Sequence, residues 1–271
     1  ETQAFCWCTA LQEVVLPSTL TTIKNSVFEN CTSLTEIVIP DSVTTIGGSA
    51  FIGCSSLKTI HLPDGLTECG EGVFGGCTSL QSFSAMDGHP LFSVKDGVLF
   101  DAAGTTLLAY PAGRTNATYR VPDGVTDIGA NAFMESQLVT VTFPDSLQRI
   151  GYCAFQNSSK LVSVVIPASV EELGGVCFYG CKALESVEFQ GTVSAIGYNC
   201  FGDTPWLNAN KEKESLFIVN NMLIYDQGCT GDVVIPDGVV TLADDALIYN
   251  DAITSVYIPD GVERIGVFAF T

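Results

Sequence analysis

The amino-acid sequence predicts a β-rich repeat solenoid built from stacked coils of about 23 residues. Prolines recur every 22 or 23 residues within three stretches of the chain, and a large apolar side chain follows each of them eleven residues later. The prolines are at positions 17, 40, 63, 122, 144, 167, 236 and 259, and the apolar residues are Phe28, Phe51, Phe74, Phe133, Phe155, Phe178, Leu247 and Phe270. A ninth unit has Gln190 in place of proline, followed by Phe201. One such unit cannot bury its apolar face alone, so the repeat implies neighbours that share a core.

Each unit is expected to open with one strand of a main sheet, and residues 34–57 (LTEIVIPDSVTTIGGSAFIGCSSL) show a complete unit. Ile37 and Ile39 alternate with other side chains, which places both on the buried face of a strand. Pro40 lacks an amide hydrogen and therefore ends that strand. The Asp-Ser or Asp-Gly that follows the repeat proline predicts a turn.

The second half of each unit is expected to return the chain along the opposite side of the coil. Val43 and Ile46 point inward from a short second strand, and Gly47 opens a short turn or a single helical turn that carries Ala50 and Phe51 to the interior. When coils stack at the strand spacing of about 4.8 Å, equivalent side chains superpose. We therefore expect the repeat phenylalanines to form a single aromatic spine.

Two segments interrupt the repeat, residues 87–118 and 205–231. Asp96-Gly97 in the first and Asn220-Asn221 in the second are typical of two-residue hairpin turns. We expect two β-hairpin insertions that extend the sheet or stand off one edge of it, within a single solenoid domain spanning residues 1–271. Both ends of the sequence fall within a repeat, which indicates a piece of a longer array.

The charge balance argues against several classes of partner. The chain has 30 acidic and 11 basic residues and a net charge of −19. This field repels phosphate backbones and anionic lipid surfaces, so we expect no nucleic-acid partner. No apolar run approaches the roughly 20 residues of a membrane helix, so no direct membrane insertion is expected in this segment. No cofactor motif stands out.

The repeat L-x-x-I-x-I-P-x-x-V-x-x-I-G-x-x-A-F-x-x-C resembles the BspA-like class of leucine-rich repeats, found in bacterial surface proteins and in some parasitic protists. The resemblance covers essentially the whole chain and implies a right-handed leucine-rich-repeat superhelix. It also implies a non-enzymatic, extracellular or cell-surface scaffold that binds proteins of a host or of other cells. A structural spacer that presents another module and a glycan-binding surface stay open as alternatives. Where commoner leucine-rich repeats have an asparagine ladder, these units have Ser or Gly, as at Ser42.

Five of the eleven cysteines share one register, three residues after the repeat phenylalanine. They are Cys8, Cys31, Cys54, Cys77 and Cys181, and other units have Ser, Thr or Asn there. A slot of this kind favours a small, weakly polar group against the backbone, which a buried free thiol satisfies. Disulfides between neighbouring ladder cysteines stay open. Cys6 and Cys229 lie outside the ladder and are expected to be the most exposed thiols.

Three other patterns invite functional readings that we do not favour. Residues 70–75 spell G-x-G-x-x-G, but the long helix of a dinucleotide site is not indicated, so the glycines belong to the repeat. His61 and His89 are expected to be exposed, without a partner for catalysis. The Asp that follows most repeat prolines is explained by the turn, and weak calcium binding by the row of Asp stays an alternative.

The broadest regular surface is predicted on the strand residues that face away from the core. The candidate partner-binding residues there are Glu36, Val38, Thr59, His61, Thr140, Thr142, Ser163, Val165, Ser186, Glu188 and Tyr257. Arg114 and Trp206, in the insertions, are further candidates because Arg and Trp are frequent anchors at interfaces. For Trp206 a local packing role is the favoured interpretation.

Overall fold

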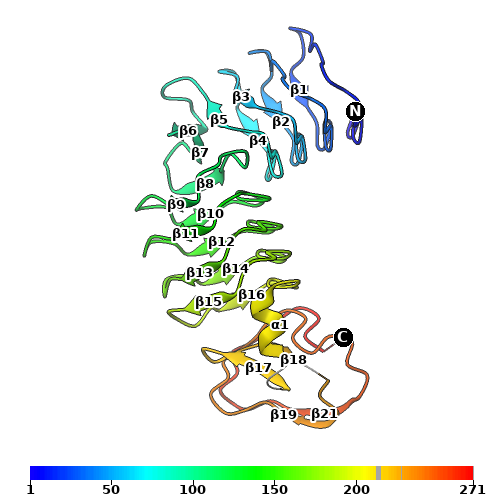
Figure 1. Cartoon of the computed structure of the whole chain (residues 1–271), viewed down its shortest axis with the longest axis vertical. Coiled ribbons are helices and arrows are strands. Elements are labelled where there is room, and N and C mark those ends of the chain that lie inside the picture. The colour runs from blue at the N-terminus through cyan, green and yellow to red at the C-terminus, as the bar shows by residue number, and fades with distance from the viewer. Residues whose placement is uncertain (212–214, 227, 271) are drawn as a thin grey trace.

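The computed structural model describes residues 1–211, 215–226 and 228–270, and it shows a solenoid of stacked coils (Figure 1). The main-sheet strands are β3 (Thr59–His61), β5 (Ser82–Ser84), β9 (Thr118–Arg120), β11 (Thr140–Thr142), β13 (Ser163–Ile166), β15 (Ser186–Phe189), β19 (Gly231–Val234) and β21 (Ile253–Tyr257). The second strands are β1 (Thr22–Ile23), β2 (Thr45–Ile46), β4 (Glu68–Cys69), β10 (Asp127–Ile128), β12 (Arg149–Ile150), β14 (Glu172–Leu173), β16 (Ala195–Ile196), β20 (Thr241–Leu242) and β22 (Arg264–Ile265).

Equivalent strands of successive coils pair in parallel and in register. Val164 of β13 lies beside Val187 of β15, and Ile150 of β12 lies beside Leu173 of β14. Residues 34–39 form no strand, although the predicted alternation holds, because Ile37 and Ile39 are buried whereas Glu36 and Val38 are exposed. The superposition predicted from the repeat is therefore present.

The tip of each coil is a pair of tight turns, so of the two expected forms the short turn is present and the helical turn is not. Ser49 and Gly53 flank the Ala-Phe pair and have left-handed backbone angles, with φ of 56° and 71°. The amide of Phe51 donates to the carbonyl oxygen of Val73 in the next coil, at 3.0 Å, and not to its own coil. Hydrogen bonds between coils thus replace those that would close a helix.

Serine hydroxyls bridge neighbouring coils at the position of the missing asparagine ladder. Ser42, Ser146 and Ser169 each donate from Oγ to a backbone carbonyl of the preceding coil, at 2.7, 2.8 and 2.7 Å. The turn after the repeat proline is therefore tied to its neighbour wherever serine is present.

The first insertion contains the predicted hairpin, formed by β6 (Phe92–Lys95) and β7 (Val98–Asp101), followed by β8 (Thr106–Ala109). Its turn residues Asp96 and Gly97 both have positive φ, as a two-residue hairpin turn requires. β8 runs antiparallel to β7 and pairs in parallel with β10, so the insertion joins the second sheet.

The second insertion contains the other predicted hairpin, formed by β17 (Leu216–Val219) and β18 (Met222–Asp226). Asn220 and Asn221 form the turn, with φ of 45° and 64°. α1 (Pro205–Lys211) precedes the hairpin, and the sequence reasoning did not anticipate this helix. The hydroxyl of Thr204 caps α1 by accepting a hydrogen bond from the amide of Leu207, at 3.2 Å.

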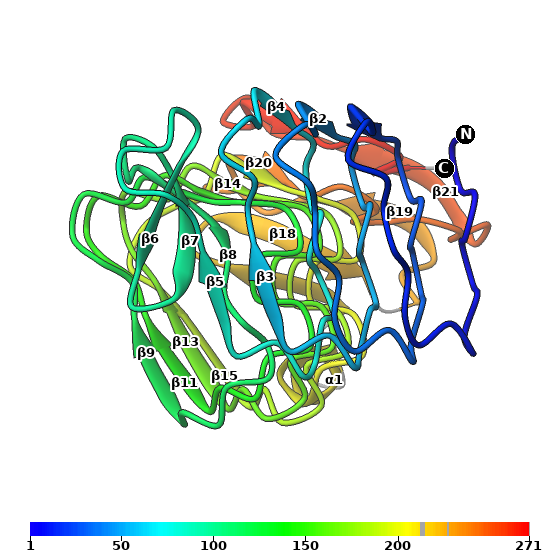
Figure 2. The same ribbon diagram turned by 90° about the horizontal axis from the view of Figure 1, so that it is seen from above.

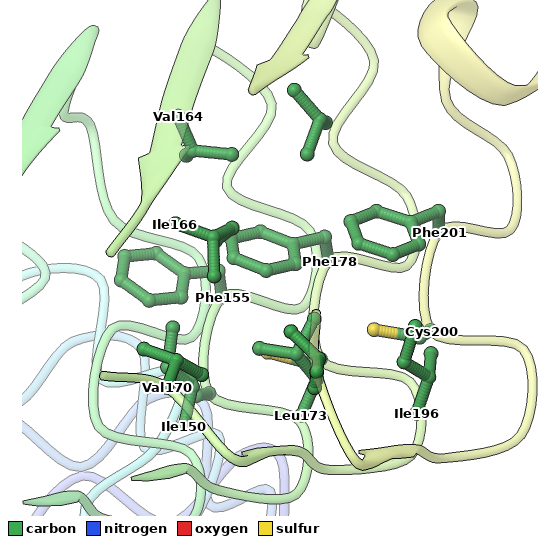
Figure 3. Packing of buried hydrophobic residues seen from close by; sticks show 14 of the residues in the cluster. Ile150, Phe155, Val164, Ile166, Val170, Leu173, Phe178, Ile196, Cys200 and Phe201 are labelled. Carbon is green, nitrogen blue, oxygen red and sulfur yellow. The ribbon is translucent and has the colours of Figure 1, made fainter. Parts of the chain in front are cut away.

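The aromatic spine is divided into two columns, which corrects the expectation of a single one. Phe5, Phe28, Phe51 and Phe74 stack with ring centroids 5.4 to 5.8 Å apart. The second column begins at Tyr110 and continues through Phe133, Phe155, Phe178 and Phe201, with spacings of 4.7 to 5.5 Å. Figure 3 shows part of this second column.

β7 lies between the two cores and accounts for the break. Leu99 packs in the N-terminal cluster, whereas its neighbours Val98 and Phe100 pack in the C-terminal one. The direction of stacking changes at this point: seen along the long axis, the blue and cyan coils spread side by side, while the green and yellow coils overlap (Figure 2). The solenoid therefore bends at the first insertion.

Candidate functional site

The outward face of the main-sheet strands carries most of the candidate residues, as predicted from their alternation. Thr59, His61, Thr142, Val165, Ser186, Glu188 and Tyr257 are exposed there, with Thr140 and Ser163 half-buried; Glu36 and Val38 are exposed on the extended segment before β3. The strands fall into three separate sheets, β3-β5, β9-β11-β13-β15 and β19-β21. The face is therefore three blocks separated by the insertions, not one continuous surface.

The four-stranded block is the most regular part of this face. Thr140, Ser163 and Ser186 are paired neighbours on successive strands, and Val165 lies beside Glu188. Arg120, which the sequence reasoning overlooked, continues the row of Thr142 on β9 and forms an exposed ion pair with Asp123 at 2.9 Å. In the first block His61 and Ser84 are joined by a hydrogen bond of 3.0 Å.

The two candidates from the insertions have structural contacts. Arg114 donates from Nε to the carbonyl oxygen of Gln81 at 3.0 Å and from Nη2 to that of Asp96, and its guanidinium lies over the Tyr110 ring. It thus joins coils on both sides of the bend. Trp206 is buried with its ring 4.8 Å from that of Phe201, which supports the packing interpretation.

The ladder cysteines bond to the backbone of the preceding coil. The thiols of Cys54, Cys77 and Cys181 donate to the carbonyl oxygens of the repeat phenylalanines one coil earlier, at 3.1 to 3.2 Å. Ser158 occupies the same slot and donates to the carbonyl oxygen of Phe133 at 2.8 Å, as expected for a small polar group in this position. Burial raises the pKa of the Cys54 thiol to about 12, so this group stays protonated at neutral pH.

Two expectations about exposure are wrong. Cys229 is buried and its thiol faces the carbonyl oxygen of Ser215 at 3.4 Å, because the second insertion folds over it, whereas Cys8 is exposed. His89 is also buried: its Nε2 lies 3.2 Å from the carbonyl oxygen of Pro63, and its Nδ1 accepts from the amide of Leu91. The Nε2 nitrogen must therefore carry the proton, and this histidine holds the first insertion against an earlier coil.

The glycines of residues 70–75 serve close packing at the bend. Gly72 has φ of 62°, and a Cβ there would lie 2.3 Å from Asn131 Nδ2. A Cβ on Gly75 would lie 2.6 Å from the Cβ of Asn131. The glycines therefore let one coil tip approach another, which agrees with their assignment to the repeat.

Two of the grooves along the edge of the coil tips lie at the insertions, and the sequence reasoning missed both. The first, of about 640 Å³, lies at the bend and is lined by residues 69–75 and 127–131, which are the ends of β4 and β10 and the start of the tips that follow them, with Arg149, Tyr152 and Glu172 beside them. The second, of about 310 Å³, lies at the second insertion, between the tips at residues 196–202 and 243–249. We name these groove 1 and groove 2.

Both grooves arise because each insertion supplies a coil without its tip. Tyr110 donates from its amide to Ala132, just as Phe133 donates to Ala154, so Tyr110 occupies the phenylalanine slot of a shortened coil. Asp226 takes this slot in the second insertion, with its amide bonded to the carbonyl oxygen of Ala246 at 2.8 Å. The sequence indicates these shortened coils, because both insertions lack the Gly-x-x-Ala-Phe pattern that forms the tip in complete coils.

Other site types find no support among the described residues. No group of three or more His, Cys, Asp or Glu side chains in this part of the chain is arranged to hold a metal ion. In the same residues there is no helix with the length and apolar character to cross a bilayer.

Comparison with solved structures supports the fold. A leucine-rich repeat protein from Eubacterium ventriosum is 18% identical with a TM-score of 0.58, and the match covers 96% of this chain and 82% of that one. The pneumococcal vaccine antigen PcpA is 19% identical with a TM-score of 0.51, covering 91% of this chain and 71% of that one. These likenesses concern the fold alone. No curated protein matches the chain.

The comparison with protein families gives a match over most of the sequence. The BspA type leucine-rich repeat region matches residues 1–98 and 114–230 in 6 copies. The gap between these two ranges falls in the first insertion, where the regular coil is replaced by β7 and β8. The structure adds further coils after residue 230, with β20 and β22 stacked in register. The chain belongs to the family of BspA-type leucine-rich repeat proteins.

Proposed function

We propose that this protein is an extracellular or cell-surface scaffold, without catalysis, that binds a protein of a host or of another cell. The outward face of β9, β11, β13 and β15 is the proposed binding surface. The observation that carries the proposal is the register of this block, which fixes exposed side chains from four coils in one regular array. The family supports a repeat scaffold for protein interaction.

The chemistry of this face suits a protein partner. Parallel strands hold its side chains on a rigid framework, so little conformational entropy is lost on binding. Thr142, Val165 and Glu188 offer small polar, apolar and acidic contacts within one block, and Arg120 adds the cation. A mixed surface of this kind is typical of interfaces that form and dissociate.

Binding to immobilised extracellular-matrix proteins, measured by surface plasmon resonance, tests the proposal. Val165→Arg places a bulky cation in the centre of the block and should weaken binding by at least about tenfold, because both size and charge disturb the contact. Glu171→Arg, at an exposed residue just before β14 on the second-strand side, is the matched control and should leave binding unchanged.

Three outcomes would contradict the proposal. Equal losses of binding in Val165→Arg and Glu171→Arg would show that the partner does not bind at the outward face of the four-stranded block. The spacer function would be favoured by two results together. The protein would bind none of the matrix proteins, and another module would stay at the cell surface only when this chain is present. Saturable binding of neutral oligosaccharides that Val165→Arg removes would favour a glycan surface.

A further inference from the structure

We propose that groove 1, groove 2 and the tyrosine pair between them form one elongated site for an extended Arg- or Lys-rich segment of a partner protein. This site lies on the edge of coil tips and not on the main-sheet face. It therefore goes beyond the proposed function and does not depend on which partner, if any, the main sheet binds.

Groove 1 and groove 2 share one structural feature, a shortened coil supplied by the insertion beside each of them. In each, a shortened coil ends at the phenylalanine slot, Tyr110 in the first and Asp226 in the second. Residues of the shortened coil form the floor, including Leu108 and Ala109 in groove 1 and Ile224 in groove 2. Each floor is thus partly apolar and its walls are the tips of complete coils.

Two exposed tyrosines connect the grooves. Tyr152 lines groove 1 and Tyr198 lines groove 2, and they are 49% and 43% exposed. Their hydroxyl oxygens are 3.0 Å apart although the residues are two coils apart in the stack. Gly175 makes this possible, because a Cβ on it would lie 2.7 Å from Tyr198 Cε1. The ring of Tyr198 therefore crosses the intervening coil over Gly175, which has no side chain, and the two tyrosine rings lie side by side between the grooves.

The charges along this edge select a cationic ligand. Glu71 and Glu172 line groove 1, where Arg149 is already paired with Asp127 at 2.5 Å. Asp244 and Asp245 line groove 2, and burial together with the Asp244 carboxylate raises the pKa of Asp245. A bound cation would relieve the repulsion between these two carboxylates.

Arginine and lysine match both kinds of group on this edge. Guanidinium groups form charge-assisted hydrogen bonds with carboxylates and also lie over the faces of aromatic rings. The net charge of −19 would attract such a segment from a distance. A nucleic acid or another anionic polymer would be repelled by the same field. The edge from one groove to the other spans about five coil spacings, on the order of 24 Å, which about seven extended residues would cover.

Fluorescence anisotropy with a short labelled arginine-rich peptide tests the proposal, using the same peptide with citrulline in place of arginine as the uncharged probe. The arginine peptide should bind saturably, and its affinity should fall as salt is raised because exposed charge pairs are screened. The citrulline peptide should bind at least about tenfold more weakly. Tyr198→Ala and Glu172→Gln should each weaken binding about three- to tenfold, and Tyr152→Ala should resemble Tyr198→Ala.

Two variants outside both grooves are the matched controls. Glu185→Gln, just before β15, removes the same charge as Glu172→Gln, and Tyr257→Ala removes a ring that is 60% exposed; both should bind the peptide as the unmodified protein does. Equal losses in Glu172→Gln and Glu185→Gln would overturn the proposal, because they would show attraction by net charge alone. Absence of saturable binding would overturn it too.

Salt-insensitive binding of a neutral oligosaccharide that is lost in Tyr198→Ala would show that the ligand of this site is a glycan and not a peptide. Unchanged far-ultraviolet circular dichroism verifies that each variant is folded.

Discussion

The thiol of Cys54 donates a hydrogen bond to the backbone carbonyl oxygen of Phe28, which lies 3.1 Å away in the preceding coil. Cys31, Cys77 and Cys181 make the same contact with the phenylalanine one coil before them. The contact is made at the inner end of each tip, beside the aromatic column. A small donor in this slot therefore couples the side-chain core to the backbone of the neighbouring coil.

The donor is what the slot requires, so Cys54→Ser should be tolerated and Cys54→Val should not. Ser158 already makes the equivalent bond in another coil, at 2.8 Å. The valine variant has no donor and carries one more methyl group than cysteine, so it should lower the free energy of unfolding by at least about 1 kcal/mol relative to the serine variant. Urea denaturation followed by circular dichroism measures the difference. Equal midpoints for the two variants would show that the hydrogen bond contributes nothing.

The buried thiols should make the protein sensitive to alkaline pH. Burial raises the pKa of Cys54, Cys69 and Cys181 to about 12 in the folded protein, whereas an unfolded thiol has a pKa near 8.5. Between these values the native state keeps protons that the unfolded chain has lost. The contribution of these thiols is fully present below about pH 8.5 and is lost as pH rises towards 12.

Urea midpoints recorded between neutral pH and about pH 11 should therefore fall steadily above pH 8.5. Cys54→Ser removes one of the titrating groups and should show a shallower decline than the unmodified protein. A decline with the same slope in both would mean that Cys54 does not contribute to it.

Arg114 should be important for the bend. Its guanidinium joins Gln81 of the N-terminal stack to Asp96 of the first hairpin, so Arg114→Ala removes two hydrogen bonds to backbone carbonyl oxygens and the contact over the Tyr110 ring. We expect a loss of about 1–3 kcal/mol and faster hydrogen exchange in β6 and β7. Arg120→Ala is the control, because its ion pair with Asp123 is highly exposed and should contribute less than about 1 kcal/mol. Similar exchange rates in the two variants would contradict this role.

Val176 stands in a position that strains its backbone. It has φ of 53°, in the left-handed region that β-branched residues avoid, and other coils have Ser49, Asn199 or Gly72 at the same point of the tip. Val176→Asn should raise the free energy of unfolding by about 1 kcal/mol, as judged from the denaturation midpoint. The reverse exchange, Asn199→Val, should lower it by a similar amount. A stabilising Asn199→Val would refute the explanation.

Much of the fold could be predicted from the sequence because the contacts that define it recur at a constant separation. The period of prolines and phenylalanines determined which residues stack, and the alternation in each strand determined which side chains are buried. The hairpin turns at Asp96-Gly97 and Asn220-Asn221 were also predictable, since positive φ at both turn residues is a local property. Even the polar slot of Cys54 could be inferred from the residues that replace it in other coils.

The insertions and the edge they shape depended on tertiary structure. Nothing local to His89 or Cys229 indicates burial, because each is covered by residues distant in sequence. The break between Phe74 and Tyr110 likewise follows from β7 packing against two cores at once. The sequence by itself determined the repeated coil, because the same contacts between equivalent residues recur from one coil to the next. Only the tertiary structure decided the bend, the two grooves and the contact between Tyr152 and Tyr198. These features arise where the repeat is interrupted or where side chains from different coils meet, so their geometry depends on packing between residues distant in sequence.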